Sequence, residues 1–84
     1  MLTAFVLIST DAGAEKEVLE KLKEIPEVTE AYIIYGVYDL VVKVRVERQE
    51  DLRDIVTNRL RKMEKIRSTL TMLAVEGFER QATG

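Results

Sequence analysis

Two short groups of residues have side chains that could bind a small ligand. The first is the turn Gly36-Val37-Tyr38-Asp39, which offers a charged acceptor next to exposed backbone N–H groups, and in which Gly36 can take a positive φ. The second is the pair Thr69 and Thr71, whose spacing places both hydroxyls on one face of a strand. Aspartate is also favoured in turns and threonine in strands, so purely structural roles remain alternatives.

The composition excludes most catalytic and metal chemistry. The chain has no cysteine and no histidine, which removes disulfides, zinc and iron–sulfur sites, and nucleophiles activated by histidine. Its acidic residues lie among lysines, and its four glycines are too scattered to form a phosphate-binding loop. We therefore expect no enzyme, no metal and no cofactor. The enzyme alternatives, a small dimeric oxygenase or an acylphosphatase-like hydrolase, lack the residues that their chemistry needs.

One segment is basic, although the formal net charge of the chain is −2. The run from Asn58 to Arg67 (NRLRKMEKIR) could form an anion or nucleic-acid patch, or it could be the end of a helix, where cations suit the helix dipole. No aromatic residue interleaves it for base stacking, which favours the helix end. We expect no direct nucleic-acid contact.

Hydrophobic periodicity predicts four strands and two helices. Strands are expected at Leu2–Thr10, Val28–Tyr35, Asp39–Val46 and Ile66–Glu76, and helices from Ala14 to Pro26, with Asp11 as N-cap, and from Gln49 to Met63. The short connection between the second and third strands predicts an antiparallel hairpin. Residues 79–84 form a polar tail, with Phe78 as its expected anchor.

The order β-α-β-β-α-β, with matching helical stripes in the two halves, predicts an α+β, ferredoxin-like sandwich. Its four-stranded antiparallel sheet would carry both helices on one face. Leu2–Thr10 is apolar on both alternating sets, so the uncovered face would also be apolar. A chain of 84 residues has a marginal core, and self-association can stabilise it. We therefore expect a dimer formed through the open sheet face; a generous core within one chain is the alternative.

The turn, the apolar strand Leu40–Val44 after it, and Thr69-Leu70-Thr71 together resemble the RAM domain, the ligand-response module of Lrp/AsnC (feast/famine) transcription regulators. The resemblance covers Leu2 to Phe78. It implies a domain over residues 1–78 that binds a small effector, usually an amino acid, and assembles from homodimers into octamers or similar rings. It implies ligand contacts by Gly36, Val37, Tyr38, Asp39, Thr69 and Thr71, with backbone N–H groups around Gly36 for a carboxylate, and Asp39 and the hydroxyls for an ammonium.

Relatives of this kind carry an N-terminal helix-turn-helix domain, and we expect none in this chain. The expected function is therefore an amino-acid-sensing module without its own DNA-binding half, which modulates transcription through oligomer assembly. The alternative is a ligand-independent adaptor that joins full-length Lrp/AsnC-type regulators. No signal peptide or membrane span is expected, so the cytoplasm is the expected compartment. Scarce Asn and Gln beside abundant charge is typical of thermophiles.

Overall fold

The computed structural model describes residues 1–80 of the chain. Its elements are β1 (Leu2–Thr10), α1 (Glu15–Leu22), β2 (Val28–Ile33), β3 (Leu40–Val46), α2 (Gln49–Asp54), the π-helical turn η1 (Ile55–Leu60), which continues α2, and β4 (Ile66–Leu73). The predicted βαββαβ order is confirmed.

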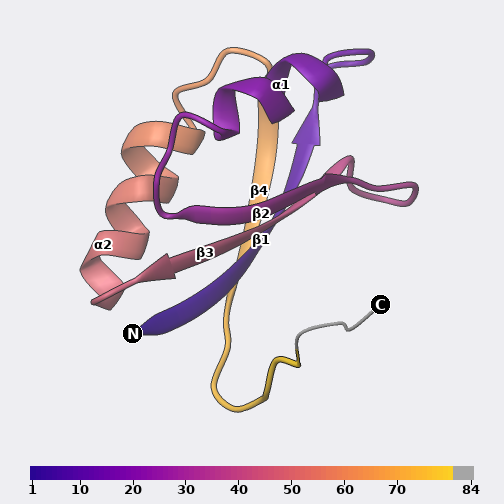
Figure 1. The fold of residues 1–84 in the computed structure, drawn as a ribbon. Coiled ribbons are helices and arrows are strands. Elements are labelled where there is room, and N and C mark those ends of the chain that lie inside the picture. Colours follow the sequence, from indigo (N-terminus) through magenta and orange to yellow (C-terminus); the bar gives the residue numbers. More distant parts are fainter. Residues whose placement is uncertain (81–84) are drawn as a thin grey trace.

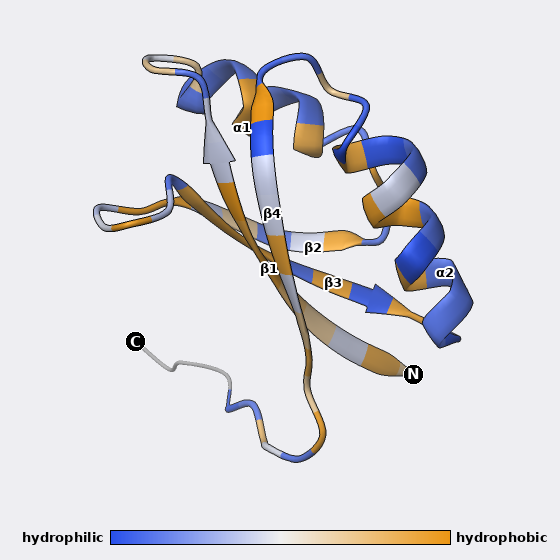
Figure 2. Ribbon diagram, turned by 180° about the vertical axis from the view of Figure 1, so that it is seen from behind, coloured by the Kyte–Doolittle hydropathy of each residue, from blue (hydrophilic) through white to orange (hydrophobic). Residues whose placement is uncertain are grey.

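The four strands form one antiparallel sheet in the order β2-β3-β1-β4 (Figure 1). The central strands β1 and β3 come from different halves of the chain, and each half supplies one edge strand. Figure 2 shows the hydrophobic sides of α1 and α2 turned towards the sheet and their hydrophilic sides turned away. The predicted ferredoxin-like sandwich with one helix-covered face is therefore confirmed.

The core lies between the helices and one face of the sheet. Alternate residues of the central strands are wholly buried, namely Ala4, Val6 and Ile8 of β1 and Leu40, Val42 and Val44 of β3. The helices add Val18 and Leu22 from α1 and Leu60 from η1, each at most 1% exposed. Most of the hydrophobic stabilisation comes from this face, because each of these side chains is removed from water on folding.

The first helix begins and ends differently from the expectation. Ala14 rather than Asp11 holds the N-cap position, and no side chain caps the helix. Asp11 acts through its backbone, whose carbonyl accepts a hydrogen bond from the Ala14 N–H at 3.0 Å. Gly13 between them has φ +80°, a conformation that side chains rarely tolerate. The α-helix ends at Leu22, before the predicted end at Pro26.

The second helix changes its winding after one and a half turns. It was expected to run unbroken to Met63, but after Asp54 it becomes the π-helical η1, where the Arg61 N–H donates to the Val56 carbonyl at 2.9 Å. A π-helical turn holds more residues than an α-helical one, so it rotates every later side chain relative to an uninterrupted helix. Sequence periodicity has no signal for this insertion.

The chain after β4 turns under the sheet on the side away from the helices (Figure 1). β4 ends at Leu73 rather than Glu76, and the Ala74 N–H makes one further bond to the Thr3 carbonyl at 2.9 Å. Phe78 does not anchor this segment, because it is 81% exposed. Glu79 does so through ion pairs to β3. Residues 81–84 of the predicted polar tail lie outside the described part of the chain.

Candidate functional site

The hairpin tip between β2 and β3 projects from the end of the sheet. Its base is closed by a hydrogen bond from the Ile34 N–H to the Asp39 carbonyl at 2.9 Å, and the Asp39 N–H donates to the Ile8 carbonyl at 2.9 Å. Val37 at the tip is 95% exposed. Gly36 does not adopt the positive φ that is open to glycine, and a Cβ placed on it would meet no atom within 4 Å. The fold of one chain therefore does not require glycine at this position.

Asp39 holds this turn to the end of β1. Its Oδ2 accepts hydrogen bonds from the Thr10 backbone N–H at 2.8 Å and from the Thr10 hydroxyl at 3.4 Å. The carboxylate thus takes the place of a backbone carbonyl where the ladder between β1 and β3 ends. Asp39 is half-buried, so these bonds are partly shielded from water and fix the direction in which the tip leaves the sheet.

Thr69 and Thr71 lie on the edge strand β4 and share one face, as predicted. Thr69 pairs with Ile8 and Thr71 with Val6, so both hydroxyls are on the helix-covered side of the sheet. Leu70 lies on the open side, opposite Leu7 of β1. The Arg61 Nε–H, which follows η1, donates to the Thr69 hydroxyl at 3.4 Å.

A groove of about 300 Å³ separates β4 from the second helix. It is lined by Gln49, Leu52, Arg53, Val56, Thr57, Arg61, Thr71 and Leu73. Leu52 and Val56 form an apolar floor, since they are only 7% and 8% exposed. Its rim is polar, and both of its charged side chains are cationic.

The six predicted ligand-binding residues fall into two separate groups within one chain. Leu40, which follows Asp39, pairs with Ile8, and Ile8 pairs on its other side with Thr69. Two strand spacings, roughly 10 Å, therefore lie between the base of the turn and Thr69. The tip projects still farther from the threonine pair.

Sequence reasoning missed the helix side of the groove. Gln49, Leu52, Arg53, Val56 and Thr57 follow the i, i+3, i+4, i+7, i+8 spacing of a single helix face, which was visible in the sequence. The sequence does not show that this helix face lies next to the threonine face of β4, and only the two faces together form the groove.

The open face of the sheet combines an apolar row with a charged row. The apolar row crosses all four strands through Tyr32, Val41, Leu7 and Leu70, which are cross-strand partners. In the next row Glu30 is paired with Lys43, and Lys43 with Phe5. This face is the surface on which a dimer is expected, and the dimer stays a prediction.

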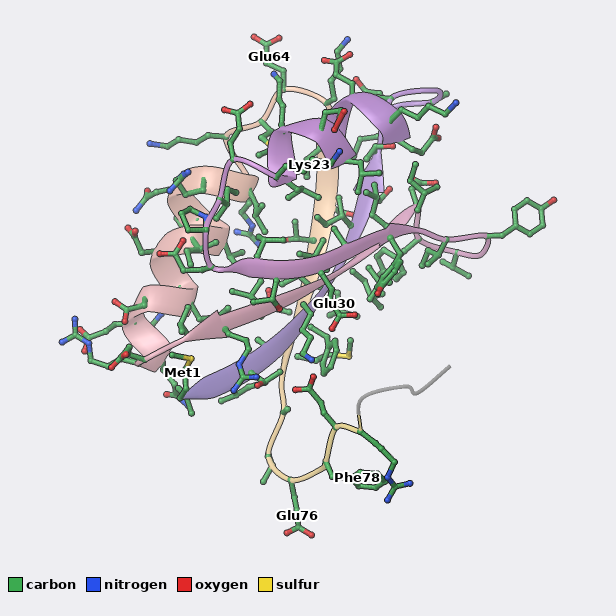
Figure 3. All side chains as sticks on the ribbon, viewed as in Figure 1. Met1, Lys23, Glu30, Glu64, Glu76 and Phe78 are labelled. Carbon is green, nitrogen blue, oxygen red and sulfur yellow. The ribbon has the colours of Figure 1, made fainter. Side chains whose placement is uncertain are left out.

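Lys43 is the centre of the charged row and is only 8% exposed. Its Nζ lies 3.2 Å from Oε2 of Glu30 and also pairs with Glu79 of the C-terminal segment, which in turn lies 3.4 Å from Nη1 of Arg45. Figure 3 shows Glu30 on the side of the sheet opposite to Lys23 of α1, facing the C-terminal segment.

These contacts shift three pKa values. Glu79, and then Glu30, raise the pKa of Lys43 above its usual value, against the opposing effect of desolvation. The Tyr32 hydroxyl, which donates to Glu30 Oε1 at 2.6 Å, and then Lys43 lower the pKa of Glu30. The same bond to Glu30 raises the pKa of Tyr32. The network is therefore most stable with Glu30 ionised and Lys43 protonated.

Within residues 1–80, none of the helices is long and apolar enough to cross a membrane. In the same part of the chain, no group of three or more acidic side chains comes together in a way that could hold a metal ion.

Comparison with known proteins places the whole frame in one family. The family model described as the Lrp/AsnC ligand binding domain matches residues 3–82. An uncharacterized HTH-type transcriptional regulator of Pyrococcus furiosus is 39% identical over 75 residues, covering 86% of this chain and 50% of the relative. The chain thus spans about half the length of that regulator. The organism of that regulator agrees with the composition of this chain, which is typical of thermophiles.

Solved structures share the fold closely. The crystal structure of FFRP-DM1 is 52% identical with a TM-score of 0.86, and the match covers 89% of this chain and all of the other. Escherichia coli AsnC has a TM-score of 0.90 at 26% identity, covering 98% of this chain and 56% of AsnC. A Neisseria meningitidis transcriptional regulator, solved as an L-Met complex, shares the fold at 15% identity and a TM-score of 0.86, covering 94% and 53%. The chain therefore belongs to the Lrp/AsnC ligand binding domain family.

Proposed function

We propose that this chain is an amino-acid-responsive regulatory module that acts in the cytoplasm and modulates transcription through its state of assembly. The effector would lie between copies, with Gly36, Val37, Tyr38 and Asp39 supplied by one copy and Thr69 and Thr71 by another. One observation carries the proposal: the two groups are about two strand spacings apart in one chain, so a small molecule that contacts both needs a second copy.

The proposed assembly begins with a dimer through the open sheet face. Residues 1–78 would form the unit that oligomerises. Leu70 and Met72 are 45% and 43% exposed on that face, and Phe5 is 37% exposed, so a second copy would remove a contiguous apolar surface from water. The hairpin tip projects beyond this face and would contact further dimers, giving an octamer or a similar ring. The N. meningitidis regulator, which shares this fold, was solved as an L-Met complex, and this supports an amino acid as the effector.

Four of the six predicted site residues have a proposed role of their own in this arrangement. Backbone N–H groups around Gly36 would receive the α-carboxylate, and the hydroxyls of Thr69 and Thr71 the α-ammonium. Asp39 orients the tip through Thr10, and its negative charge also favours the ammonium. Close approach of the effector to the backbone would explain a glycine at position 36, because neither its φ nor its surroundings within one chain require glycine.

Calorimetric titration of the oligomeric protein with each of the twenty amino acids tests the proposal, and light scattering follows the assembly. We expect at least one amino acid to bind and to change the mass of the assembly. No binding across the whole set would refute an amino-acid effector.

Two glycine variants separate ligand contact from folding. Gly36→Ala should leave the stability of the fold unchanged and weaken effector binding at least tenfold. Gly13→Ala should do the reverse, lowering stability by about 1 kcal/mol because Gly13 has a positive φ, with little effect on binding. Equal binding by Gly36→Ala and the unchanged protein would contradict the proposed contact.

A ligand-independent adaptor is the second candidate. The observation that favours it is the fully exposed hairpin tip, where Tyr35 and Val37 could dock directly on a longer regulator without an effector. An adaptor would join a full-length relative in light-scattering mixtures equally well with and without amino acids, whereas an amino-acid sensor would not.

A further inference from the structure

We infer that the groove between β4 and the second helix selects an acidic amino acid, with Arg53 and Arg61 holding its side-chain carboxylate. The inference rests on the proposed function, because the groove contains Thr71 of the proposed effector site. It adds the chemical class of the effector and two residues that determine specificity.

The groove is electropositive in a chain that is acidic as a whole. Arg53 and Arg61 are its charged lining residues, and none of the lining residues is acidic. Within residues 1–80 neither arginine takes part in an ion pair. The acidic residues in the first turn of α2 lie instead near Arg48, whose guanidinium is 3.7 Å from Glu50 and 3.6 Å from Asp51. Two guanidinium groups are thus left to face the same opening.

The π-helical turn brings the two arginines into closer alignment at the groove. In an uninterrupted α-helix, eight residues at about 100° each would place Arg61 roughly 80° around the axis from Arg53, at the edge of the same broad face. The wider turn of η1 rotates less per residue and brings Arg61 onto the face of Arg53 and Thr57. Turns of this kind are rare and are frequent at functional sites. Here the turn also brings the Arg61 Nε to 3.4 Å from the Thr69 hydroxyl.

The arginines can form strong contacts to a carboxylate. Guanidinium groups bind carboxylates through paired, charge-assisted hydrogen bonds, which are stronger than neutral ones. The apolar floor of Leu52 and Val56 lowers the local dielectric, and the hydroxyls of Thr57 and Thr71 offer further polar contacts at the rim. A groove of about 300 Å³ admits a small molecule.

Charge balance identifies the class of ligand. The complete proposed site contains two cations, Arg53 and Arg61, and one anion, Asp39 of the second copy, which gives a formal sum of +1. A neutral amino acid would leave one guanidinium without a counter-charge. An acidic amino acid has a net charge of −1, which matches the site: its α-ammonium lies with Asp39 and the threonine hydroxyls, and its second carboxylate lies with the arginines.

Calorimetry on the oligomeric protein at pH 7 tests the inference with aspartate and glutamate against asparagine and glutamine, which have the same shape without the charge. We expect the acids to bind at least tenfold more tightly than their amides. Arg53→Gln and Arg61→Gln should each remove most of this preference. Arg59→Gln is the matched control, because Arg59 belongs to the same turn but does not line the groove. Arg53→Lys, which keeps the charge but loses paired hydrogen bonds, should give an intermediate affinity.

The possible results separate the inference from the proposed function. If an amide or another neutral amino acid binds as tightly as the acids, or if the arginine variants bind the acids normally, the inference is wrong and the amino-acid sensor stands. If succinate binds and no amino acid does, an acidic ligand is supported in the groove and the amino-acid effector is refuted. If no compound binds, both are refuted.

Discussion

The two faces of the sheet are built from the same strands but have opposite characters. Along β3, Val42 and Val44 are completely buried beneath the helices, whereas Val41 and Lys43, which alternate with them, belong to the open face. Apart from Thr10 at the end of β1, the side chains that these central strands bury on the covered face are aliphatic. The open face carries an apolar row beside a charged row in which each ion has a partner. The covered face is suited to permanent burial. The open face is suited to reversible association with a partner surface.

The largest expected effect comes from adding a charge to each face in turn. Val42→Lys would bury an ammonium group with no partner, which costs roughly 4 kcal/mol or more and is enough to unfold a small domain. Val41→Lys, one residue away, should fold because its side chain lies on the open face. Circular dichroism and urea denaturation measure both. A folded Val42→Lys variant would show that the covered face is less closed than its burial indicates.

The next comparison removes apolar contacts from neighbouring residues of β1. Ile8→Ala should lower the free energy of unfolding by about 2–5 kcal/mol, because a cavity remains under the helices. Leu7→Ala on the open face should cost less than about 1.5 kcal/mol in dilute solution, where water fills the space. Urea denaturation followed by circular dichroism suits this chain, which has no tryptophan. Equal losses at both positions would remove the distinction between the faces.

A third comparison tests whether the open face forms the dimer. Leu70→Glu places a charge in the apolar row and should raise the dissociation constant of the dimer at least tenfold, or about 1.4 kcal/mol. Ala12→Glu makes the same change in charge at an exposed turn and should leave assembly unchanged. Sedimentation and light scattering at several protein concentrations measure both. If Leu70→Glu assembles like the control, the dimer uses another surface.

The strand alternation and helical stripes predicted the fold, its layers and the face of each β4 threonine, because these depend on local periodicity. Contacts between distant segments were not predictable in this way. The bond between Asp39 and Thr10 joins residues 29 positions apart, and it depends on where the β1–β3 ladder ends. The orientation of Arg61 depends on a π-helical turn, for which the sequence carries no periodic signal.

The charged network was missed for the same reason. Lys43 lies in an otherwise apolar strand, and its partners come from β2 and from the C-terminal segment. The cross-strand register brings Glu30 opposite Lys43, and the turn after β4 brings Glu79 to both Lys43 and Arg45. The same register exposes this network on the open face, where its protonation can be tested directly.

The smallest expected effect is a pH dependence that belongs to the open face. The Tyr32 hydroxyl and Lys43 lower the pKa of Glu30 below 4.5, so ionised Glu30 stabilises the fold above that pH, and this contribution is lost as the pH falls through the lower pKa of the folded state. Lys43, whose pKa is raised by Glu79 and Glu30, stays protonated across this range and loses its proton only in alkali. Glu30→Gln should therefore lower the urea midpoint slightly at pH 7, and the difference from the unchanged protein should shrink below pH 4.5. Tyr32→Phe, which removes the larger cause of the shift, should show part of the same change. A difference that stays constant from pH 7 to pH 3 would mean that Glu30 does not couple protonation to folding, and that the charged row differs from the covered face only in exposure.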